Sequence, residues 1–459
     1  MSGIVAGSVL ETIGNTPLIR LARLGAGIRT PIFGKAEYVN PGGSVKDRIG
    51  LAIIEAAERD GTLRPGGTIV EGTSGNTGVG LAIAAALKGY HCIFTMPDKM
   101  SQEKVRLLRA YGAEVVITPT AVPPDHPENY VMKAKQIVHD TPGAVLANQF
   151  YNQVNPESHY RSTGPEIWEQ TGGAVTHFVA GAGTGGTVSG VGRYLKERNP
   201  AIRILASDPA GSLYAGYHRT RTLAGDGAPY KVEGIGGDKA PDTVWWDVID
   251  EFRTVSDKDA MALARRLARE EGILVGGSTG ANLHVALEVA RDLDDPRACV
   301  VTILADTGER YLSKVFNDDW LRENQLLDSP RDTVATLLAR RTGSAPALVQ
   351  VAPSAQLRQA LNLMSTYDVS QLPVIDEGRS IGTLVEATLM QRALEQPVLL
   401  DRPVREVMDP PLPEVEASWP MERLAAILTK DSPAALVRDN GKLAGIVSRY
   451  DLLRVMIGR

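Results

Sequence analysis

The sequence contains little of what marks a secreted, membrane-bound or nucleic-acid-binding protein. Two cysteines occur in 459 residues, Cys92 and Cys299, both among apolar neighbours, so we expect buried thiols in a reducing compartment rather than a disulfide framework. No segment approaches the run of about 18 apolar residues that spans a membrane. The formal net charge of −5 leaves no basic footprint for nucleic acid. We therefore expect a cytoplasmic protein with no membrane or nucleic-acid partner.

The sequence also lacks the patterns of a metal site and of a signal peptide. The seven histidines show no metal-ligand spacing, so no metal site is expected. The N-terminus lacks a basic region and reaches Glu11 quickly, so no signal peptide is expected. What remains is a long chain, sufficient for two or three domains, in which apolar strand-like segments alternate with longer helical patterns. This alternation predicts a doubly wound α/β fold for the first two thirds of the chain.

Lys46 stands in the run Asn-Pro-Gly-Gly-Ser-Val-Lys-Asp-Arg at 40–48. Ser44, followed three residues later by Asp47, predicts a capping-box start for a helix that continues through 49–57. Lys46 would then lie in the first turn, where the helix dipole disfavours a cation and favours the neutral amine that attacks an aldehyde. On this run alone, a solvated lysine is the simpler interpretation.

A second loop, Gly-Thr-Ser-Gly-Asn-Thr-Gly at 72–78, joins a predicted strand at 68–71 to a helix running to Leu87. Hydroxyls, an amide and free backbone N–H groups at a helix start form an anion site, which suits an amino-acid carboxylate. The alternative is a polar strand-to-helix turn without a ligand, but such turns are usually shorter.

A third loop, Gly-Ala-Gly-Thr-Gly-Gly-Thr at 181–187, follows a predicted strand at 176–180 and precedes a helix to Arg198. It fits the G-x-G-x-x-G fingerprint of dinucleotide-binding proteins, and Asp208 follows where a ribose-binding acid is expected. That interpretation explains neither Lys46 nor the loop 72–78. Glycines and threonines in this order suit a single terminal phosphate equally well.

Taken together, the three loops resemble those of the fold-type II pyridoxal-phosphate enzymes, and within them the family of cystathionine β-synthase and cysteine synthase. The resemblance extends over residues from about 11 to about 320 and opens with Glu-Thr-Ile-Gly-Asn-Thr-Pro-Leu at 11–18. It implies pyridoxal phosphate as cofactor, with Lys46 as the Schiff-base lysine and Asn76 at the phenolic oxygen. The haem-binding extension of animal relatives has no counterpart here, so no haem is expected.

The same resemblance assigns the other contacts. The phosphate loop comprises Gly183, Thr184, Gly185, Gly186 and Thr187. The substrate carboxylate is assigned to Thr73, Ser74, Thr77 and Gln149.

Ser278, in Gly276-Gly277-Ser278, matches the serine that faces the pyridine nitrogen. A hydroxyl in place of a carboxylate leaves that nitrogen largely unprotonated, which weakens the electron sink and directs flux towards loss of a β-leaving group. Without the resemblance, Ser278 is more simply a turn residue.

The last third of the chain contains an internal repeat. Val-Ala-Pro-Ser at 351–354 recurs as Val-Glu-Ala-Ser at 415–418, and Asp-Glu-Gly at 376–378 recurs as Asp-Asn-Gly at 439–441. A period of about 60 residues implies two copies of one supersecondary unit packed on each other. The pattern resembles a tandem of CBS domains, a Bateman module, and implies an adenosyl ligand such as S-adenosylmethionine or AMP.

The second copy matches the ligand-binding pattern of such modules better than the first. Ser448 and Asp451 stand where these modules contact ribose, and an aspartate can accept from both ribose hydroxyls. Val385 and Thr388 hold those positions in the first copy, so one nucleoside site is expected. The alternative is that Asp451 only caps the final helix.

The joined architecture resembles the cystathionine β-synthase branch of this family more than most cysteine synthases, and this resemblance implies condensation of serine, or an activated serine, with homocysteine. Lys-Val-Glu-Gly-Ile-Gly at 231–236 matches the family segment whose glutamate is linked to homocysteine, which implies that role for Glu233. Thr-Gly-Glu-Arg-Tyr at 307–311 looks more like cysteine synthase, and Gly72 and Gly237 replace a proline and a tyrosine of relatives. Sulfhydrylation of O-acetylserine or O-phosphoserine therefore stays open.

A third hypothesis is a nucleotide-sensing regulator without activity, against which the complete set of cofactor residues argues. We expect a catalytic region at 1–325, a linker at 326–335 and a regulatory module at 336–459 with repeats at about 336–398 and 399–459. Both the fold and tandem CBS modules commonly dimerise, so a homodimer or homotetramer acting on small amino-acid substrates is expected.

Overall fold

The computed structural model describes residues 5–457 except 74, 99, 101, 124, 328–332, 340–345, 347, 430 and 431. The chain divides into two compact units, Met1–Leu327 and Asp328–Arg459. Ser74 of the predicted substrate loop and residues 328–332 of the expected linker lie outside the described residues. No helix in these described ranges is long and apolar enough to cross a membrane.

The first unit contains a six-stranded sheet in the order β1-β2-β10-β7-β8-β9. All neighbours are parallel except β1, which pairs antiparallel with β2. The strands are β1 (Leu18–Arg20), β2 (Ile32–Ala36), β7 (His177–Gly181), β8 (Arg203–Pro209), β9 (Glu251–Val255) and β10 (Val300–Leu304). Strand β10, Val-Val-Thr-Ile-Leu, is buried at every position, as expected for a parallel strand covered on both faces.

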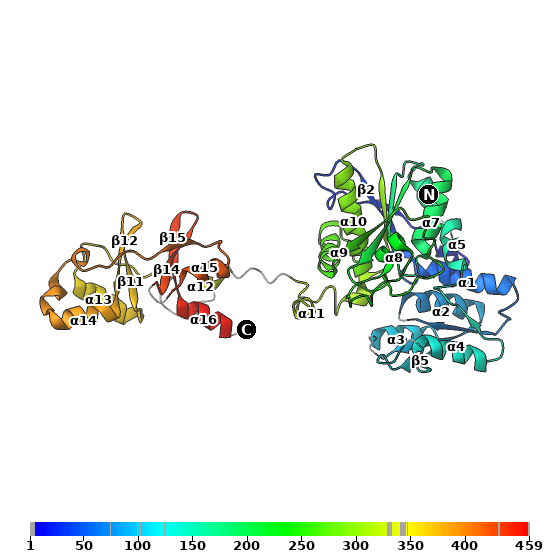
Figure 1. Cartoon of the computed structure of the whole chain (residues 1–459), viewed down its shortest axis with the longest axis horizontal. Coiled ribbons are helices and arrows are strands. Elements are labelled where there is room, and N and C mark those ends of the chain that lie inside the picture. The colour runs from blue at the N-terminus through cyan, green and yellow to red at the C-terminus, as the bar shows by residue number, and fades with distance from the viewer. Residues whose placement is uncertain are drawn as a thin grey trace. The chain divides into compact units, whose positions relative to one another are not determined.

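Helices cover both faces of this sheet, with α9 and α10 on one side and α7 on the other (Figure 1). Helix α9 has the expected terminal signals, because the Ser256 hydroxyl caps its start and Gly272 ends it in the left-handed conformation. The helices of this part are α5 (Val154–Arg161), α6 (Thr163–Gln170), α7 (Gly186–Arg198), α8 (Tyr214–Thr220), α9 (Asp257–Glu271), α10 (Gly277–Leu293) and α11 (Asp318–Glu323).

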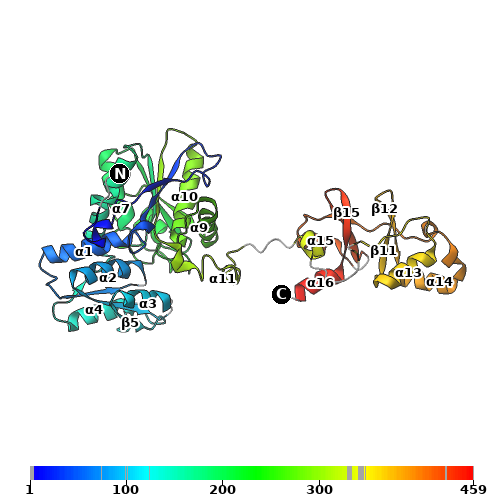
Figure 2. The same cartoon turned by 180° about the vertical axis from the view of Figure 1, so that it is seen from behind.

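A second, parallel sheet of four strands lies in the same unit in the order β5-β4-β3-β6. Its strands are β3 (Thr68–Gly72), β4 (His91–Pro97), β5 (Glu114–Thr118) and β6 (Val145–Leu146). Helices α1 to α4 surround it, as seen from behind in Figure 2. They are α1 (Lys46–Arg59), α2 (Asn76–Lys88), α3 (Gln102–Ala110) and α4 (Tyr130–Asp140). The two sheets, parallel except for the edge strand β1, carry helices on their faces and confirm the predicted α/β class.

The first turn of α1 rests directly on α2. A Cβ atom at Gly50 would lie 2.3 Å from the carbonyl carbon of Gly80, and one at Gly80 would lie 2.6 Å from the carbonyl oxygen of Lys46. No side chain fits between the two helices at these points. The position of Lys46 is therefore fixed by the packing of α1 on α2.

The predicted capping box of Ser44 and Asp47 is wrong. Helix α1 begins at Lys46 with Val45 as its N-cap residue, which has no side-chain oxygen to offer. The Ser44 hydroxyl accepts from the backbone N–H of Lys46, and Asp47 accepts from the backbone N–H of Gly42 at 2.5 Å. The carboxylate thus closes the preceding loop instead of the helix start.

The second unit contains the two expected copies of one motif. In each copy a hairpin precedes a helix: β11 (Gln371–Asp376), β12 (Arg379–Val385) and α14 (Glu386–Glu395) in the first, and β14 (Ala434–Asp439), β15 (Lys442–Ser448) and α16 (Arg449–Ile457) in the second. Strand β13 (Glu414–Glu416) pairs with β14. The remaining helices are α12 (Val334–Ala339), α13 (Leu357–Tyr367) and α15 (Met421–Ile427).

The repeated sequence has a repeated geometry. Both hairpin turns place two successive residues at positive φ, Glu377 and Gly378 in one and Asn440 and Gly441 in the other, as a two-residue hairpin turn requires. Both hairpins also shift register at the same point, after Val374 and after Val437. The internal repeat read from the sequence is therefore a repeat of backbone structure.

Candidate active site

The three predicted loops line one cavity of about 690 Å³ in the first unit. The cavity lies at the carboxyl ends of β3 and β7, where ligands bind in open parallel sheets. With Ser74 outside the described residues, every other residue predicted for the cofactor or the substrate lines it. These are Lys46, Thr73, Asn76, Thr77, Gln149, Gly183, Thr184, Gly185, Gly186, Thr187, Glu233 and Ser278.

Lys46 is the first residue of α1 and is half-buried at the cavity. Burial lowers the pKa of its ammonium group below the usual value, and the carboxylate of Asp306 opposes that effect. Desolvation favours the neutral form of an amine, because it penalises the charged form. The lysine is therefore poised to act as a base or a nucleophile.

The glycine loop before α7 has the shape of a phosphate site. Gly185 is in the left-handed conformation at φ 75°, and a Cβ atom at Gly183 would lie 2.3 Å from the carbonyl oxygen of Gly234. The Thr184 hydroxyl accepts from the side-chain amide of Asn155 at 2.9 Å. The first N–H groups of α7 have no partner within the helix, and they face the cavity from its N-terminus. This cradle fits a phosphate monoester.

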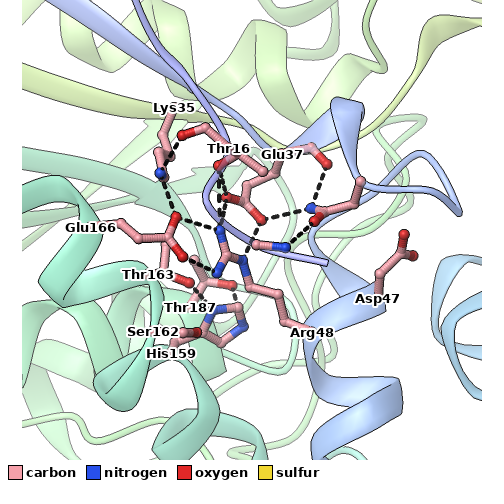
Figure 3. Close-up of polar contacts among 12 residues, drawn as sticks. Thr16, Lys35, Glu37, Asp47, Arg48, His159, Ser162, Thr163, Glu166 and Thr187 are labelled. Carbon is pink, nitrogen blue, oxygen red and sulfur yellow. Dashed lines mark hydrogen bonds and ion pairs between the residues drawn. The ribbon is translucent and has the colours of Figure 1, made fainter. Parts of the chain in front are cut away.

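His159 supports the glycine loop from behind. Its Nε2 atom lies 3.2 Å from the Thr187 hydroxyl, and its Nδ1 atom lies 2.9 Å from the Thr163 hydroxyl. Figure 3 shows the ring with one contact to each of the two threonines. Sequence reasoning missed this residue, because no motif marks it and it comes from α5, 28 positions before Thr187.

An ionic network next to His159 anchors α1 (Figure 3). Arg48 forms ion pairs with Glu37 at 2.7 Å and with Glu166 at 2.6 Å, and Lys35 pairs with Glu166 at 2.6 Å. Burial raises the pKa of Glu166, but Arg48 and Lys35 outweigh it and lower that pKa to about 2. Lys35 also donates to the carbonyl oxygen of Thr16. The network therefore ties the segment before β1 to α1, β2 and α6.

The loop 72–78 and Gln149 form one hydrogen-bonded wall of the cavity. The Thr77 hydroxyl donates to Oε1 of Gln149 at 2.6 Å, and the Thr73 hydroxyl accepts from the backbone N–H of Gly75. Glu71, at the end of β3, accepts from the backbone N–H groups of Asn148 and Gln149. Burial raises the pKa of Glu71 to about 7, against these hydrogen bonds. Glu71 thus holds the Gln149 segment beside the threonines.

Asn76 is engaged by two residues that sequence reasoning did not assign to the site. Its side-chain amide donates to Oδ2 of Asp306 at 2.7 Å, and its carbonyl oxygen accepts from Arg310. Oδ2 of Asp306 also accepts from the Tyr311 hydroxyl at 2.6 Å. Burial raises the pKa of Asp306, and Tyr311 and Asn76 oppose that effect. Asp306 lies two residues after the end of β10 and 230 positions from Asn76 in the sequence, so only the tertiary fold brings the two side chains together.

Ser278 lies in the first turn of α10, buried at the cavity wall. Among the described residues its hydroxyl has no hydrogen-bond partner, so it is available to a ligand. Asn282, one turn further, is occupied by the hydroxyl of Ser207 and the carbonyl oxygen of Ile303. A neutral hydroxyl is therefore the polar group that α10 presents to a heterocyclic nitrogen.

The cavity fits pyridoxal phosphate. It gives no ligand-binding role to the acid that a dinucleotide site would place at the ribose. Asp208 accepts from the backbone N–H of Ala215 at 2.9 Å and so holds the start of α8. The phosphate cradle, the half-buried Lys46 and the unpartnered Ser278 hydroxyl together suit a phosphorylated pyridine aldehyde. A dinucleotide would leave Lys46 and the loop 72–78 without function.

The predicted regulatory residues lie in the second unit. Oδ2 of Asp451 accepts from the backbone N–H of Ser448 at 2.8 Å and from its hydroxyl at 2.7 Å, and the Ser448 hydroxyl lies 3.2 Å from the backbone N–H of Asp451. This is a capping box at the start of α16. Asp451 therefore has the helix-capping role that the sequence analysis gave as the alternative to ribose binding.

Comparisons with known proteins agree with this geometry. Residues 9–306 match the model of the pyridoxal-phosphate-dependent enzymes, and residues 344–395 and 404–458 match the CBS domain. A cystathionine β-synthase from Dictyostelium discoideum is 35% identical over 99% of this chain and 93% of its own length. The chain is therefore a pyridoxal-phosphate-dependent enzyme with a tandem of CBS domains.

Comparison with solved structures indicates the family within the pyridoxal-phosphate-dependent enzymes. An O-acetylserine-dependent cystathionine β-synthase from Helicobacter pylori is 38% identical, with a TM-score of 0.62 over 68% of this chain and 99% of its own. An O-ureido-L-serine synthase is 37% identical, with a TM-score of 0.63 over 70% of this chain and all of its own. Within its class, this chain belongs to the cystathionine β-synthase family.

Proposed function

We propose that the enzyme condenses L-serine, or an activated serine, with L-homocysteine to give cystathionine. The observation that carries the proposal is the single cavity in which Lys46, the phosphate cradle and the carboxylate loop meet. The Cβ–O bond of the donor breaks, a Cβ–S bond to the acceptor forms, and water or the corresponding acid leaves.

The residues of the cavity would hold pyridoxal phosphate in one orientation. The backbone N–H groups and hydroxyls of 183–187 would bind the phosphate, Ser278 the pyridine nitrogen, Asn76 the phenolic oxygen and Lys46 the aldehyde carbon. When bound, this cofactor withdraws electrons from the substrate Cα and so makes its proton removable.

Lys46 would carry the proton between the steps. Because burial lowers its pKa, its amine is neutral in a larger fraction of molecules than that of an exposed lysine. Freed from the cofactor by the substrate, Nζ of Lys46 would take the Cα proton and return it after the thiol has added.

The carboxylate loop would set the geometry of that proton transfer. Thr73, Ser74, Thr77 and Gln149 would bind the donor carboxylate and so hold the Cα–H bond towards Lys46. The mutual hydrogen bond of Thr77 and Gln149 places both side chains on the same wall before any ligand arrives.

The test is mass spectrometry of the products. The purified enzyme with pyridoxal phosphate is given serine, O-acetylserine or O-phosphoserine together with homocysteine and sulfide in competition. Cystathionine as the dominant product is expected. Cysteine alone would overturn the proposal and place the enzyme with the sulfhydrylases, to which the run Thr-Gly-Glu-Arg-Tyr at 307–311 is similar.

We further propose that the CBS module binds an adenosyl ligand, S-adenosylmethionine or AMP, with Ser448 and Asp451 at its ribose. A carboxylate has room for more than one donor, because its two oxygens offer about four lone-pair sites. The ligand can change catalysis only through different affinity for two arrangements of the enzyme. We also expect a homodimer or homotetramer, which sedimentation analysis of the full chain would detect.

A further inference from the structure

The segment 305–307 lies between two stretches of the cofactor site. On one side, backbone hydrogen bonds of 2.8 and 3.0 Å join it to residues 43–45, directly before Lys46. On the other side, an isolated β-bridge joins it to the stretch that leads to Ser278. Asp306, in the middle of the segment, is buried and lines the cavity. Its backbone is therefore fixed relative to both parts of the site.

The side chain of Asn76 is held at both of its polar atoms. Its NH2 group donates to Oδ2 of Asp306 at 2.7 Å, and its carbonyl oxygen accepts from the guanidinium group of Arg310. A guanidinium group can only donate, so the carbonyl oxygen must face Arg310 and the NH2 group must face Asp306. The two neighbours thus determine the orientation of the Asn76 amide.

One N–H of Asn76 remains for a ligand. An NH2 group has two donors. Asp306 takes one of them, and no other group among the described residues takes the second. Asn76 lies at the start of α2 and lines the cavity. What it offers to a ligand there is therefore a hydrogen-bond donor and not an acceptor.

We propose that Asp306 and Arg310 are positioning residues that turn an N–H of Asn76 towards the phenolic oxygen of pyridoxal phosphate, so that this oxygen is bound in its ionised form. The inference rests on the proposed function, in which Asn76 lies at that oxygen. A hydrogen bond to an anion is stronger than one to a neutral oxygen, so a donor at this place favours the ionised phenol. An amide turned the other way would present an acceptor and favour the neutral phenol.

The charge of Asp306 by itself acts in the opposite direction. A carboxylate near a second anion disfavours that anion. If Asp306 affected the cofactor through its charge alone, its removal would increase the ionised form of the phenol. If Asp306 orients Asn76, its removal should decrease that form. The two effects therefore differ in sign.

The experiment measures absorption spectra of the full-length enzyme loaded with pyridoxal phosphate and freed of excess cofactor. The ionised and neutral forms of the phenol absorb in separate bands. In Asp306→Leu, the ratio of ionised to neutral form should fall roughly 10- to 100-fold. Asp306→Asn removes the charge but keeps an acceptor oxygen for Asn76, so its ratio should stay or rise. Glu309→Gln, at an exposed position beside Arg310, should keep the wild-type ratio.

A second measurement compares the Kd of pyridoxal phosphate with that of 3-deoxypyridoxal phosphate, which lacks the phenolic oxygen. The preference for pyridoxal phosphate should fall by a similar factor in Asp306→Leu and in Arg310→Met, and it should persist in Asp306→Asn. Ratios within one variant cancel any loss of folded enzyme.

An unchanged preference in Asp306→Leu, or a band ratio that stays or rises in that variant, would overturn the inference, because Asp306 would then act through packing or charge alone. Failure of the proposed function is a different result. Cysteine in place of cystathionine as the product would overturn that proposal and would leave both ratios as expected here.

Discussion

The Thr187 hydroxyl lies 3.2 Å from Nε2 of His159, whose other ring nitrogen lies 2.9 Å from the Thr163 hydroxyl. Burial lowers the pKa of His159 well below its usual value, and the positive charges of Arg48 and Lys46 act in the same direction. A neutral imidazole offers one donor and one acceptor, so it fixes both hydroxyls in complementary orientations. His159 therefore orients the hydroxyl at the end of the phosphate loop.

Replacing His159 with phenylalanine should weaken cofactor binding more than it weakens catalysis. The ring would still fill the space, but Thr187 would lose the partner that orients it. Loss of one buried hydrogen bond corresponds to roughly a tenfold rise in the Kd of pyridoxal phosphate. Absorbance titration of the apoenzyme measures that Kd. His284→Gln, at a partly exposed position on α10, is the control, and an unchanged Kd in His159→Phe would rule out the positioning role.

Lys46→Ala should abolish turnover while leaving the protein folded. Loss of a general base alone costs about 10²- to 10⁴-fold, and loss of covalent attachment adds to it. Intact-mass analysis after borohydride reduction should show cofactor attached to wild type and to Lys88→Ala, but not to Lys46→Ala. Attachment that persists at another lysine would contradict the assignment of Lys46.

Gly80→Ala should lower both stability and activity. The added Cβ atom would lie 2.6 Å from the carbonyl oxygen of Lys46 and 3.0 Å from Cα of Asp47, so α1 would have to move. Overpacking of this kind costs roughly 1–3 kcal/mol. Gly216→Ala is the matched control, because that helical glycine has no neighbouring atom within 4 Å of the added Cβ. Thermal midpoints and kcat/KM, compared between the two variants, test the prediction.

The sequence was sufficient to predict the three loops of the site. It was not sufficient to predict the residues from distant segments that contact these loops. The strand, the glycine-rich turn and the helix around 181–187 are encoded within one short stretch, because apolar periodicity and turn residues are local signals. The predicted start of that strand at 176 differs by one residue from the observed His177. Asp306 and Arg310 reach Asn76 across some 230 positions, and that contact depends on the order of the strands.

The capping box was predicted wrongly for the same reason, because the true partners depend on tertiary packing. Ser44 and Asp47 have the spacing of a helix start, but the glycine loop before them requires its own hydrogen bonds. Asp47 supplies one of these by accepting from Gly42. The choice between the two partners depends on how the loop packs against the segment of Thr307 and Arg310, which no local pattern contains.

Asp47→Asn should stabilise the enzyme at pH 8 more than at pH 5. Burial raises the pKa of Asp47 to about 7, although the N–H of Gly42 and the charge of Arg310 oppose it. In the unfolded chain this carboxyl titrates near pH 4. Between about pH 4 and pH 7 the folded state therefore holds a proton that the unfolded state has lost, so stability falls as the pH rises through that window.

An asparagine at this position stays neutral and can still accept from Gly42. The difference in free energy of unfolding between Asp47→Asn and wild type should thus grow by roughly 2 kcal/mol from pH 5 to pH 8. Urea unfolding at the two pH values measures it. Asp226→Asn, at an exposed position, serves as the control. A difference that does not change with pH would mean that Asp47 is already ionised in the folded protein at pH 5.

Asp451→Asn separates the two roles of the residue at the start of α16. Its amide oxygen can still accept from the backbone N–H of Ser448, so the helix cap is largely retained. It cannot accept from two ribose hydroxyls as a carboxylate does. We expect the Kd of AMP or S-adenosylmethionine, measured by calorimetry, to rise at least tenfold in this variant, with a nearly wild-type thermal midpoint of the module.

Asp451→Ala should lose ligand binding and also about 1 kcal/mol of stability, because it removes the cap as well. Asp439→Asn, exposed at the hairpin turn of the same copy, should change neither quantity. If wild type and Asp451→Asn bind the ligand with the same heat and affinity, the carboxylate is a helix cap only, and the ribose lies elsewhere in the module.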